Sequence, residues 1–350
     1  MKATKKILAS VLALTMAFGL TACGQPDDSG SQNDGKTEYK VGIVQYMDHA
    51  SLNQIVASIE ARLDEKGEEL GVVFNYEDYY QNGQADNSVM NQIAADLIAD
   101  EVDIIVPIAT PVAEVMQAAT EDNQIPIVFS AVSDPVGAKL VSSMDAPGGN
   151  ITGTSDYLDT NAIMNLIFSA DPDCDCVGLL YNVGEDSSAA PIAAAKEYLD
   201  AKGVAYVERT GTTTDEILLA AEALVAEGVD AVFTPTDNTI MAAELTIYET
   251  FLEAGVPHYG GADTFALNGA FCGYGVDYEN LGIMTADMIV EILVNGADPA
   301  SIPVMTFDNG IATVNTETCE GLGLNMDDIR AAFEPLCTKL QEITTAENFE

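Results

Sequence analysis

Hydroxyl, amide and carboxylate side chains recur in this 350-residue chain directly after short apolar runs. The positions are Gln45 and Tyr46; Thr110 and Pro111; Ser130, Ala131, Ser133 and Asp134; Thr154, Ser155 and Asp156; Tyr181 and Asn182; Thr236, Asp237 and Asn238; and Asp263 and Thr264. None of them is a Lys or an Arg. Such a set suits a small polar molecule, above all a zwitterion. Hydroxyls and helix N-termini can hold a carboxylate, a carboxylate side chain can hold an ammonium group, and a tyrosine face can cover an apolar side chain.

Each of these residues alone also has a purely structural explanation, because Thr, Ser, Asp and Asn are the usual helix caps and turn formers. A binding site is favoured because both halves of the chain place such residues at equivalent points. Residues 41–44 are matched by 177–180 at an offset of 136, and residues 94–111 parallel 221–238 at an offset of 127. The two halves therefore share one plan.

Apolar strands without alternation, each followed by a segment of helical periodicity, predict parallel sheets that are covered on both faces. We expect strands at 41–46, 72–77, 103–108, 126–130 and 151–155, and again at 177–181, 204–209, 231–235, 257–261 and 271–276. A late helix at 279–294 and the segment 302–307 lead into a C-terminal tail. Right-handed crossovers make each half a doubly wound lobe, in which ligands collect beyond the carboxyl ends of the strands.

The N-terminus has the pattern of a bacterial lipoprotein signal. Three lysines precede the apolar stretch 7–20, and small residues then lead to Cys23. Cleavage would leave Cys23 as a lipidated N-terminus on a flexible, polar tether, with the rest of the chain outside the cytoplasmic membrane. The alternative is an ordinary cleaved secretion signal with a chance cysteine. The apolar stretch is short for a membrane span.

Charge and cysteine content exclude some classes of partner and site. The chain has 56 acidic and 13 basic residues and a net charge of −43, which argues against nucleic acid and anionic lipid as partners. With two histidines, His49 and His258, no zinc-type cluster can be assembled. Five cysteines remain beside Cys23. We expect buried, inert thiols, with Cys319 and Cys337 the first candidates for a disulfide if one forms.

Seven motifs carry a resemblance to a known family. They are VGIVQYMDH at 41–49, PIATP at 107–111, VFSAVSDPVGA at 128–138, PGGNITGTSD at 147–156, LLYNVGEDSS at 180–188, TPTDNT at 234–239 and GVDYENLG at 275–282. In this order they resemble the extracytoplasmic substrate-binding proteins of ABC transporters, in the family that includes tryptophan and tyrosine binders. The resemblance implies a type I periplasmic-binding fold, in which two α/β lobes with doubly wound parallel sheets are joined by a three-strand hinge and close on a ligand.

The same resemblance implies a division of the chain and a set of ligand contacts. The division is a signal peptide at 1–22, a lipidated Cys and tether at 23–38, lobe 1 at 39–155 plus 277–304, and lobe 2 at 156–276 plus 305–350. The chain departs from the family's usual Glu-His-Pro at Asp48-His49-Ala50, and from Glu-Ala-Asn-Ser at residues 185–188. The predicted ligand-binding residues, from the strand ends and the resemblance together, are Gln45, Tyr46, Thr110, Pro111, Ser130, Ala131, Asp134, Ser155, Asn182, Glu185, Ser188, Thr236, Asp237, Asn238 and Asp263.

We therefore expect a monomeric lipoprotein, anchored outside the cytoplasmic membrane, that binds an amino acid and delivers it to an ABC permease without cofactor or metal. An aromatic amino acid is the first expectation, with Asp237 or Asp263 as partner of its ammonium group. The alternatives are a sugar, a nucleoside or another small metabolite on the same fold, and service to a sensory receptor. An enzyme is disfavoured because dinucleotide-binding, phosphate-binding and nucleophile-elbow motifs do not occur in the sequence.

Overall fold

The computed structural model describes residues 36–307 and 309–349, and residues from Thr37 onward form one compact unit. The predicted signal peptide, the lipidated Cys23 and almost all of the tether lie outside the described residues. Among the helices that are described, none combines the length and the apolar character needed to cross a membrane.

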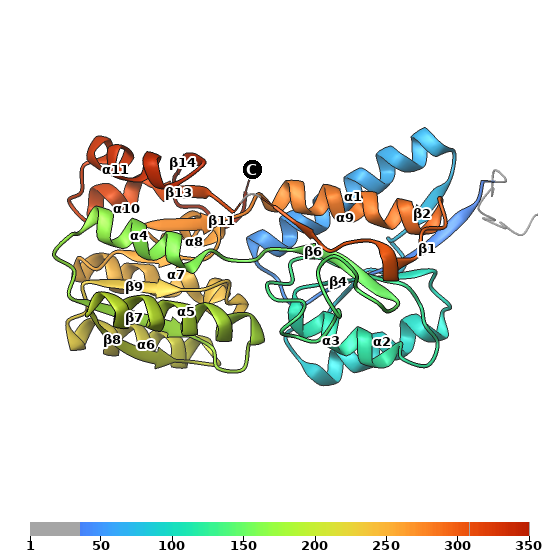
Figure 1. Ribbon diagram of the computed structural model, residues 1–350, viewed down its shortest axis with the longest axis horizontal. Coiled ribbons are helices and arrows are strands. Elements are labelled where there is room, and N and C mark those ends of the chain that lie inside the picture. Colours follow the sequence, from blue (N-terminus) through green and yellow to red (C-terminus); the bar gives the residue numbers. More distant parts are fainter. Residues whose placement is uncertain (1–35, 308, 350) are drawn as a thin grey trace, which may run out of the picture. The chain divides into compact units, whose positions relative to one another are not determined.

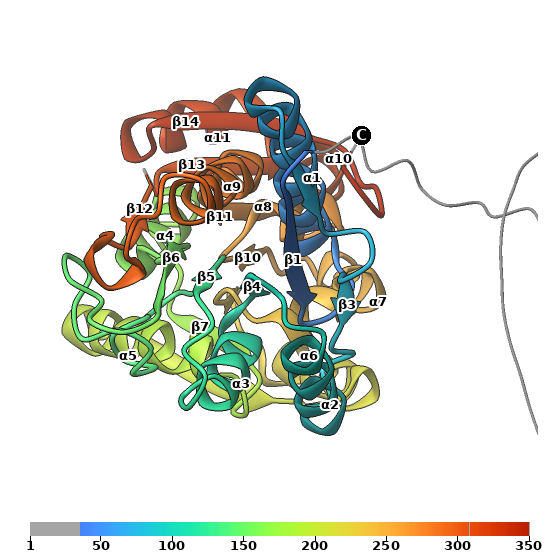
Figure 2. The same ribbon diagram turned by 90° about the vertical axis from the view of Figure 1, so that its right-hand side faces the viewer.

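The first lobe is built on a parallel sheet with the strand order β12-β6-β5-β4-β1-β2, and β3 also pairs with β1. Its strands are β1 (Glu38–Gln45), β2 (Val73–Asn75), β3 (Gln81–Asn82), β4 (Ile104–Ile108), β5 (Ile127–Phe129), β6 (Ile151–Ser155) and β12 (Met305–Thr306). Helices α1 (Ala50–Leu70) and α9 (Tyr278–Leu293) pack together over one face, and α2 (Asn87–Ala99) and α3 (Thr110–Ala119) cover the other (Figures 1 and 2). We call this assembly lobe 1.

The second lobe is built on a sheet with the order β14-β13-β11-β10-β9-β7-β8. Its strands are β7 (Cys176–Tyr181), β8 (Ala205–Thr210), β9 (Ala231–Thr234), β10 (His258–Gly260), β11 (Cys272–Gly275), β13 (Ile311–Asn315) and β14 (Lys339–Ile343). Its helices are α4 (Thr160–Ala170), α5 (Asp186–Lys202), α6 (Thr214–Glu227), α7 (Asn238–Ala254), α8 (Asp263–Leu267), α10 (Thr316–Gly321) and α11 (Met326–Phe333), and the chain also has 3-10 turns at Pro299–Ser301 and Glu334–Leu336.

Alternate strand residues of lobe 2 face different helices, so both faces of this sheet are buried. Leu179 and Phe233 belong to a cluster with residues of α4, α5 and α11. Leu180 and Val232 belong to the cluster that contains α6 and α7. A strand that is buried on both faces needs apolar residues at successive positions, which explains the unbroken apolar runs in the sequence.

The predicted fold class, two α/β lobes with doubly wound parallel sheets, is confirmed, and all ten predicted strands are present. The chain crosses between the sheets three times, after β6, after β11 and after β12. The predicted limits of lobe 2 need one correction: β12 pairs with β6, so residues 305 and 306 lie in lobe 1. The tail holds two further strands, because β13 pairs antiparallel with β11 and parallel with β14.

The five described cysteines are unpaired, so no disulfide joins Cys319 and Cys337. Burial is the main cause that raises the pKa of Cys174 to about 12, and it also raises the pKa of Cys319 and Cys337. These thiols stay protonated at neutral pH, which makes them poor nucleophiles and metal ligands.

Candidate functional site

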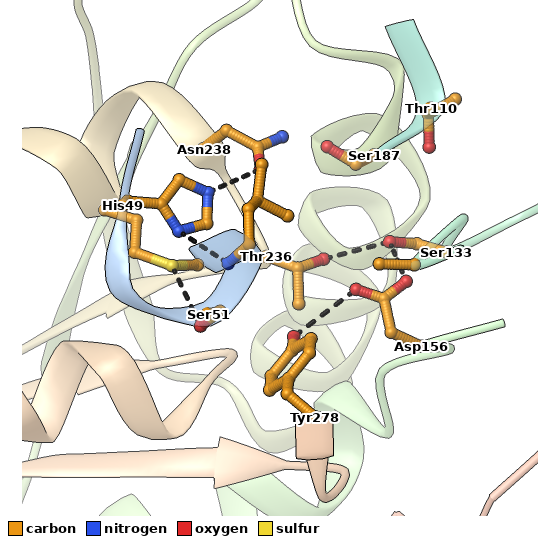
Figure 3. Close-up of a pocket in the computed structure, with 12 residues that line it drawn as sticks. His49, Ser51, Thr110, Ser133, Asp156, Ser187, Thr236, Asn238 and Tyr278 are labelled. Carbon is orange, nitrogen blue, oxygen red and sulfur yellow. Dashed lines mark hydrogen bonds between the residues drawn. The ribbon is translucent and has the colours of Figure 1, made fainter. Parts of the chain in front are cut away.

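A small pocket lies between the two lobes, at the carboxyl ends of the central strands. Its volume is about 10 Å³, which leaves room for about one water molecule. Figure 3 shows its polar side chains converging from both lobes. The lining residues are His49, Ser51, Leu52, Thr110, Ala131, Ser133, Asp156, Ser187, Thr236, Asn238, Met241 and Tyr278.

Hydrogen bonds join the lobes directly at this pocket. His49 Nε2 lies 3.0 Å from Asn238 Oδ1, Ser133 Oγ lies 3.1 Å from Thr236 Oγ1, and Ser51 Oγ bonds to Thr264 Oγ1. Each of these bonds pairs a residue of lobe 1 with a residue of lobe 2. The structure is therefore one in which the lobes meet.

His49 has a defined tautomer in this arrangement. It is the N-cap of α1, and its Nδ1 accepts a 3.5 Å hydrogen bond from the backbone N–H of Leu52. Its Nε2 therefore carries the proton that is donated to Asn238 Oδ1. Burial lowers the pKa of His49 to about 4, so the ring is neutral at pH 7.

Asp156 is a buried carboxylate in the pocket wall, with 6% of its surface exposed. Its Oδ1 accepts a 2.9 Å hydrogen bond from Ser133 Oγ, and its Oδ2 accepts a longer one, 3.4 Å, from the Tyr278 hydroxyl. Since Ser133 donates its only proton to Asp156, the Thr236 hydroxyl must donate to Ser133. Burial raises the pKa of Asp156, and its described partners are neutral, so a cation in the pocket would favour its charged form.

Two helix N-termini open toward the same region without a side-chain cap. The N-cap of α3 is Ala109, and that of α5 is Glu185, whose side chain makes no capping bond to its own helix. Thr110 and Ser187, from the first turns of these helices, both line the pocket. The backbone before α3 is strained, since Ala109 has a φ of 81°, and Ala131 at the end of β5 has a φ of 54°. Uncapped N–H groups attract anions.

Two larger hollows adjoin the pocket and share lining residues with it. One, of about 300 Å³, includes Ser133 and Ser187 and is walled by Tyr157, Leu158 and Pro191. The other, of about 250 Å³, includes Thr110 and Ser187. Tyr157 is 60% exposed although it is aromatic. Pocket and hollows together give the region between the lobes room for a small organic molecule.

Some predicted site residues line these spaces. Thr110, Ala131, Thr236 and Asn238 line the pocket, and Asp134 lines both hollows. Burial, followed by the charges of Glu185 and Asp237, raises the pKa of Tyr46 to about 12, which places Tyr46 near these two acids. Pro111 occupies the second position of α3 and does not line the pocket.

Other predicted residues of lobe 1 bond within their own lobe. Gln45 Nε2 donates to Asn53 Oδ1 and to the carbonyl of Met47, each at 2.7 Å. Ser130 Oγ lies 3.0 Å from Thr285 Oγ1 in the lobe core. Ser155 Oγ donates to the carbonyl of Ser133 at 3.4 Å. These polar groups hold strand ends in place.

The predicted acids of lobe 2 cap helix α7. Asp237 accepts from the N–H of Asn182 at 2.6 Å, the hydroxyl of Ser188 at 2.7 Å and the N–H of Ile240 at 3.0 Å. Glu185 accepts from the N–H groups of residues 238 and 239 and from both of their side chains. Burial, followed by the charge of Glu185, raises the pKa of Asp237 to about 8.

Asp263, the first residue of α8, differs from the other predicted acids. Its Oδ1 is buried without a hydrogen-bond partner. Burial, with a contribution from the charge of Asp277, raises its pKa to about 7. It does not line the pocket, but its charge acts on Tyr278, which does.

Sequence reasoning left several pocket residues out of the predicted set. They are His49, Ser51, Leu52, Ser133, Asp156, Ser187, Met241 and Tyr278. Ser133 and Asp156 had been noted as strand-end residues, and His49 and Ser187 lie in the two motifs that depart from the family pattern. Ser51, Leu52 and Met241 lie in the first turns of helices, where nothing in the sequence distinguishes them from core positions. Tyr278 lies in the motif at 275–282 but was not selected from it. Over the described part of the chain, no cluster of three or more His, Cys, Asp or Glu side chains is arranged to hold a metal ion.

Comparison with known proteins places this architecture in a family. Residues 40–332 match the family described as ABC transporter substrate binding protein. A tyrosine-binding protein of Clostridioides difficile (strain R20291) is 32% identical over 336 residues, which cover 93% of this chain and 96% of that protein.

Two solved structures bear on the arrangement of the lobes. An ABC domain from Streptococcus pneumoniae in complex with L-Trp has a TM-score of 0.78 at 30% identity, and the match covers 87% of this chain and all of that one. A ligand-free, open substrate-binding protein with adhesive properties from Clostridium difficile has a TM-score of 0.65, also at 30% identity, with 88% of this chain and all of that one covered. At equal identity, this structure superposes better on the L-Trp complex than on the open, ligand-free protein. The chain belongs to the family of ABC transporter substrate-binding proteins.

Proposed function

We propose that this protein captures an aromatic amino acid between its lobes and delivers it to an ABC permease while anchored outside the membrane through Cys23. The similarity to a tyrosine-binding protein and to a domain that binds L-Trp supports the ligand class. The observation that carries the proposal is the position of Asp156. This buried carboxylate lies in the same pocket as the first-turn residues of two uncapped helices.

Asp156 is the group that we assign to the ligand's ammonium. Its hydrogen bonds come from two neutral hydroxyls, so burial of its charge is not offset by a cation. An ammonium group within hydrogen-bond distance would supply that charge and lower the raised pKa of Asp156. Asp237 is less suited to this role, because three donors of lobe 2 already occupy its two oxygens. Asp263, with a buried and unpartnered oxygen, is the second candidate.

The ligand's carboxylate would lie at the N-termini of α3 and α5. Each contributes partial positive charge and N–H groups, and the hydroxyls of Thr110 and Ser187 can donate as well. One helix belongs to lobe 1 and the other to lobe 2. A carboxylate between them would therefore draw the lobes together.

The aromatic side chain would occupy the hollow of about 300 Å³ beside the pocket. Leu158 and Pro191 supply apolar surface there, and the exposed ring of Tyr157 can cover an aromatic ligand. Burial of this ring against a ligand would remove apolar surface from water, which favours binding.

Capture would follow from ligand-driven closure. A ligand that contacts both lobes stabilises the closed form by its additional contacts in that form. The cross-lobe bonds of His49, Ser51 and Ser133 would form at the same time. The permease would then recognise the closed form.

Isothermal titration calorimetry tests the proposal with L-Trp, L-Tyr and L-Phe, and with a sugar and a nucleoside for comparison. Wild-type protein should bind at least one aromatic amino acid. Asp156→Asn should bind it about 10- to 100-fold more weakly, because a hydrogen bond to a charged group contributes about 1.5–3 kcal/mol. The matched control, Asp215→Asn, removes an exposed carboxylate of α6 and should bind as wild type. Binding of only the sugar or nucleoside would overturn the ligand class, and unchanged affinity in Asp156→Asn would move the ammonium site elsewhere.

A further inference from the structure

The last residues of the chain extend from lobe 2 to the surface of lobe 1. After β14 ends at Ile343, the backbone at residues 345–347 bonds to lobe 2, and Asn348 and Phe349 then line a hollow of about 410 Å³ together with residues of lobe 1. We call residues 344–349 the tail. The lobe 1 residues that line the hollow are Ala50, Asn53, Gln54, Ala57 and Ser58 of α1 and Glu279 of α9.

Buried asparagines fix the tail to lobe 2. Asn315 Nδ2 donates to Thr345 Oγ1 at 2.9 Å, and Asn268 Nδ2 donates to the carbonyls of Ala346 at 2.8 Å and Glu347 at 3.3 Å. The N–H of Ala346 also donates to a carbonyl of α8 at 2.8 Å. Asn315 is fully buried and Asn268 is 5% exposed. Because buried amides need hydrogen-bond partners, lobe 2 holds the tail in place as far as residue 347.

The start of α1 borders both the ligand pocket and the hollow beside the tail. Residues 50, 53, 54, 57 and 58 are spaced three or four apart, so they share one face of the helix. His49, Ser51 and Leu52, at the same end of α1, line the ligand pocket, and the first two of them hydrogen-bond to lobe 2. The tail therefore faces the part of lobe 1 that meets lobe 2 when the lobes close.

The composition of the hollow suits an aromatic ring. Phe349, which is partly buried, is the aromatic residue among those that line it. The facing side chains of Ala50, Ala57 and Ser58 are small and leave room for the ring. The charged residue of the lining, Glu279, is exposed. Contact between the Phe349 ring and α1 removes apolar surface from water, which favours the arrangement in which the lobes meet.

We propose that the tail is an interlobe strap, which is fixed to lobe 2 and packs Phe349 against α1 when the lobes close. Opening breaks the bonds of His49 and Ser51 and moves this end of α1 away from lobe 2, and with it from the tail. The strap stabilises the closed form alone, so it raises ligand affinity without a contact to the ligand. This inference rests on the ligand-driven closure proposed above.

Calorimetry with L-Trp, L-Tyr and L-Phe tests the strap in three variants. Phe349→Ala and a chain that ends at Glu347 should each bind about three- to tenfold more weakly than wild type, since the closed form loses the burial of one aromatic ring. The matched control, Leu219→Ala, removes a 64% exposed apolar side chain from α6 of lobe 2 and should bind as wild type. Wild-type affinity in both tail variants would overturn the proposal. If the shortened chain does not fold, Phe349→Ala decides.

Fluorescence follows the strap directly, because the chain has no tryptophan. Phe349→Trp introduces a single indole, which can be excited beyond the absorption of L-Tyr and L-Phe. When either ligand binds, the emission should shift to shorter wavelength and acrylamide should quench it less, since the ring leaves water. Leu219→Trp is the control and should show neither change. Binding of a ligand with no change at position 349 would contradict the strap.

A scattering measurement separates the strap from the proposed ligand. If wild type binds none of the three amino acids, the ligand class fails, and small-angle X-ray scattering of the ligand-free protein then decides the inference. Wild type should be more compact than both Phe349→Ala and the chain that ends at Glu347, because the strap favours the closed form. Equal radii of gyration in the three proteins would refute it.

Discussion

Replacement of Asp237 by Ala separates a structural from a ligand-binding role for an acid whose carboxylate is already held by three donors. The sequence assigns this residue, or Asp263, to the ligand's ammonium. In the structure its carboxylate instead accepts from the N–H of Asn182, the hydroxyl of Ser188 and the N–H of Ile240, all within lobe 2. We therefore expect Asp237→Ala to destabilise lobe 2 in the absence of any ligand.

The size of this effect can be worked out from the three bonds. Loss of the N-cap of α7 costs about 1 kcal/mol. The N–H of Asn182 and the hydroxyl of Ser188 lose a buried acceptor, at about 1–3 kcal/mol each. The mutation also relieves repulsion from Glu185, which contributes to the raised pKa of Asp237 and offsets part of the loss. The net destabilisation should be about 3 kcal/mol, which lowers the Tm by about 5 °C or more.

Thermal unfolding followed by circular dichroism, without ligand, is the assay, and Asp263→Ala is the comparison. Asp263 has a buried oxygen without a partner, so its removal should leave the Tm unchanged or raise it. Calorimetry with L-Trp then gives the affinities of both variants. The reasoning is refuted if Asp237→Ala melts within about 1 °C of wild type and still loses tenfold or more in affinity. That result would identify Asp237 as the residue that binds the ligand's ammonium group.

Two further predictions concern the N-cap of α1 and the N-terminus of the chain. Because the pKa of His49 is lowered to about 4 in the closed form from an ordinary 6.5, closure should lose stability as the pH falls from 6.5 toward 4. His49→Asn keeps a capping side chain but does not titrate. Its ligand affinity, measured by calorimetry, should fall less between pH 7 and pH 5 than that of wild type. Equal losses of affinity in both proteins would count against a role of His49 in the pH dependence of closure. Cys23→Ser should move the protein from the membrane fraction to the soluble fraction of expressing bacteria, as detected by immunoblotting, whereas retention in the membrane would mean that the lipoprotein signal was misread.

The strands were predictable because sheets covered on both faces require apolar residues at successive positions. The segment IIVPI of β4 is buried throughout, and no polar side chain interrupts it, although it contains Pro107. β14 escaped prediction because it is an edge strand with the mixed sequence KLQEI, none of whose residues is fully buried. The pairing of β12 with β6 depends on two residues that return from a distant part of the chain, which local patterns do not contain.

The position of the site was also predictable, because parallel strands bring their carboxyl ends to one edge of a sheet. The identity of the residues that line the site was harder to predict. Asp156 and Asp237 are both acids after an apolar strand, yet Asp156 faces the pocket and Asp237 caps a helix. Hydrogen bonds between segments far apart in sequence decide this, such as the bond from the N–H of Asn182 to Asp237.

The distribution of helix caps gives a sharper indication of the site than the strand ends do. Glu185 precedes α5 but caps α7 through the N–H groups of residues 238 and 239. Because Glu185 bonds to α7, the N-terminus of α5 has no side-chain cap, and neither does the N-terminus of α3. All three helices contribute pocket residues, but the N-terminus of α7 is already capped by two carboxylates. Because unsatisfied N–H groups favour an anion, these two helices, rather than the acids of α7, indicate where a ligand carboxylate should bind.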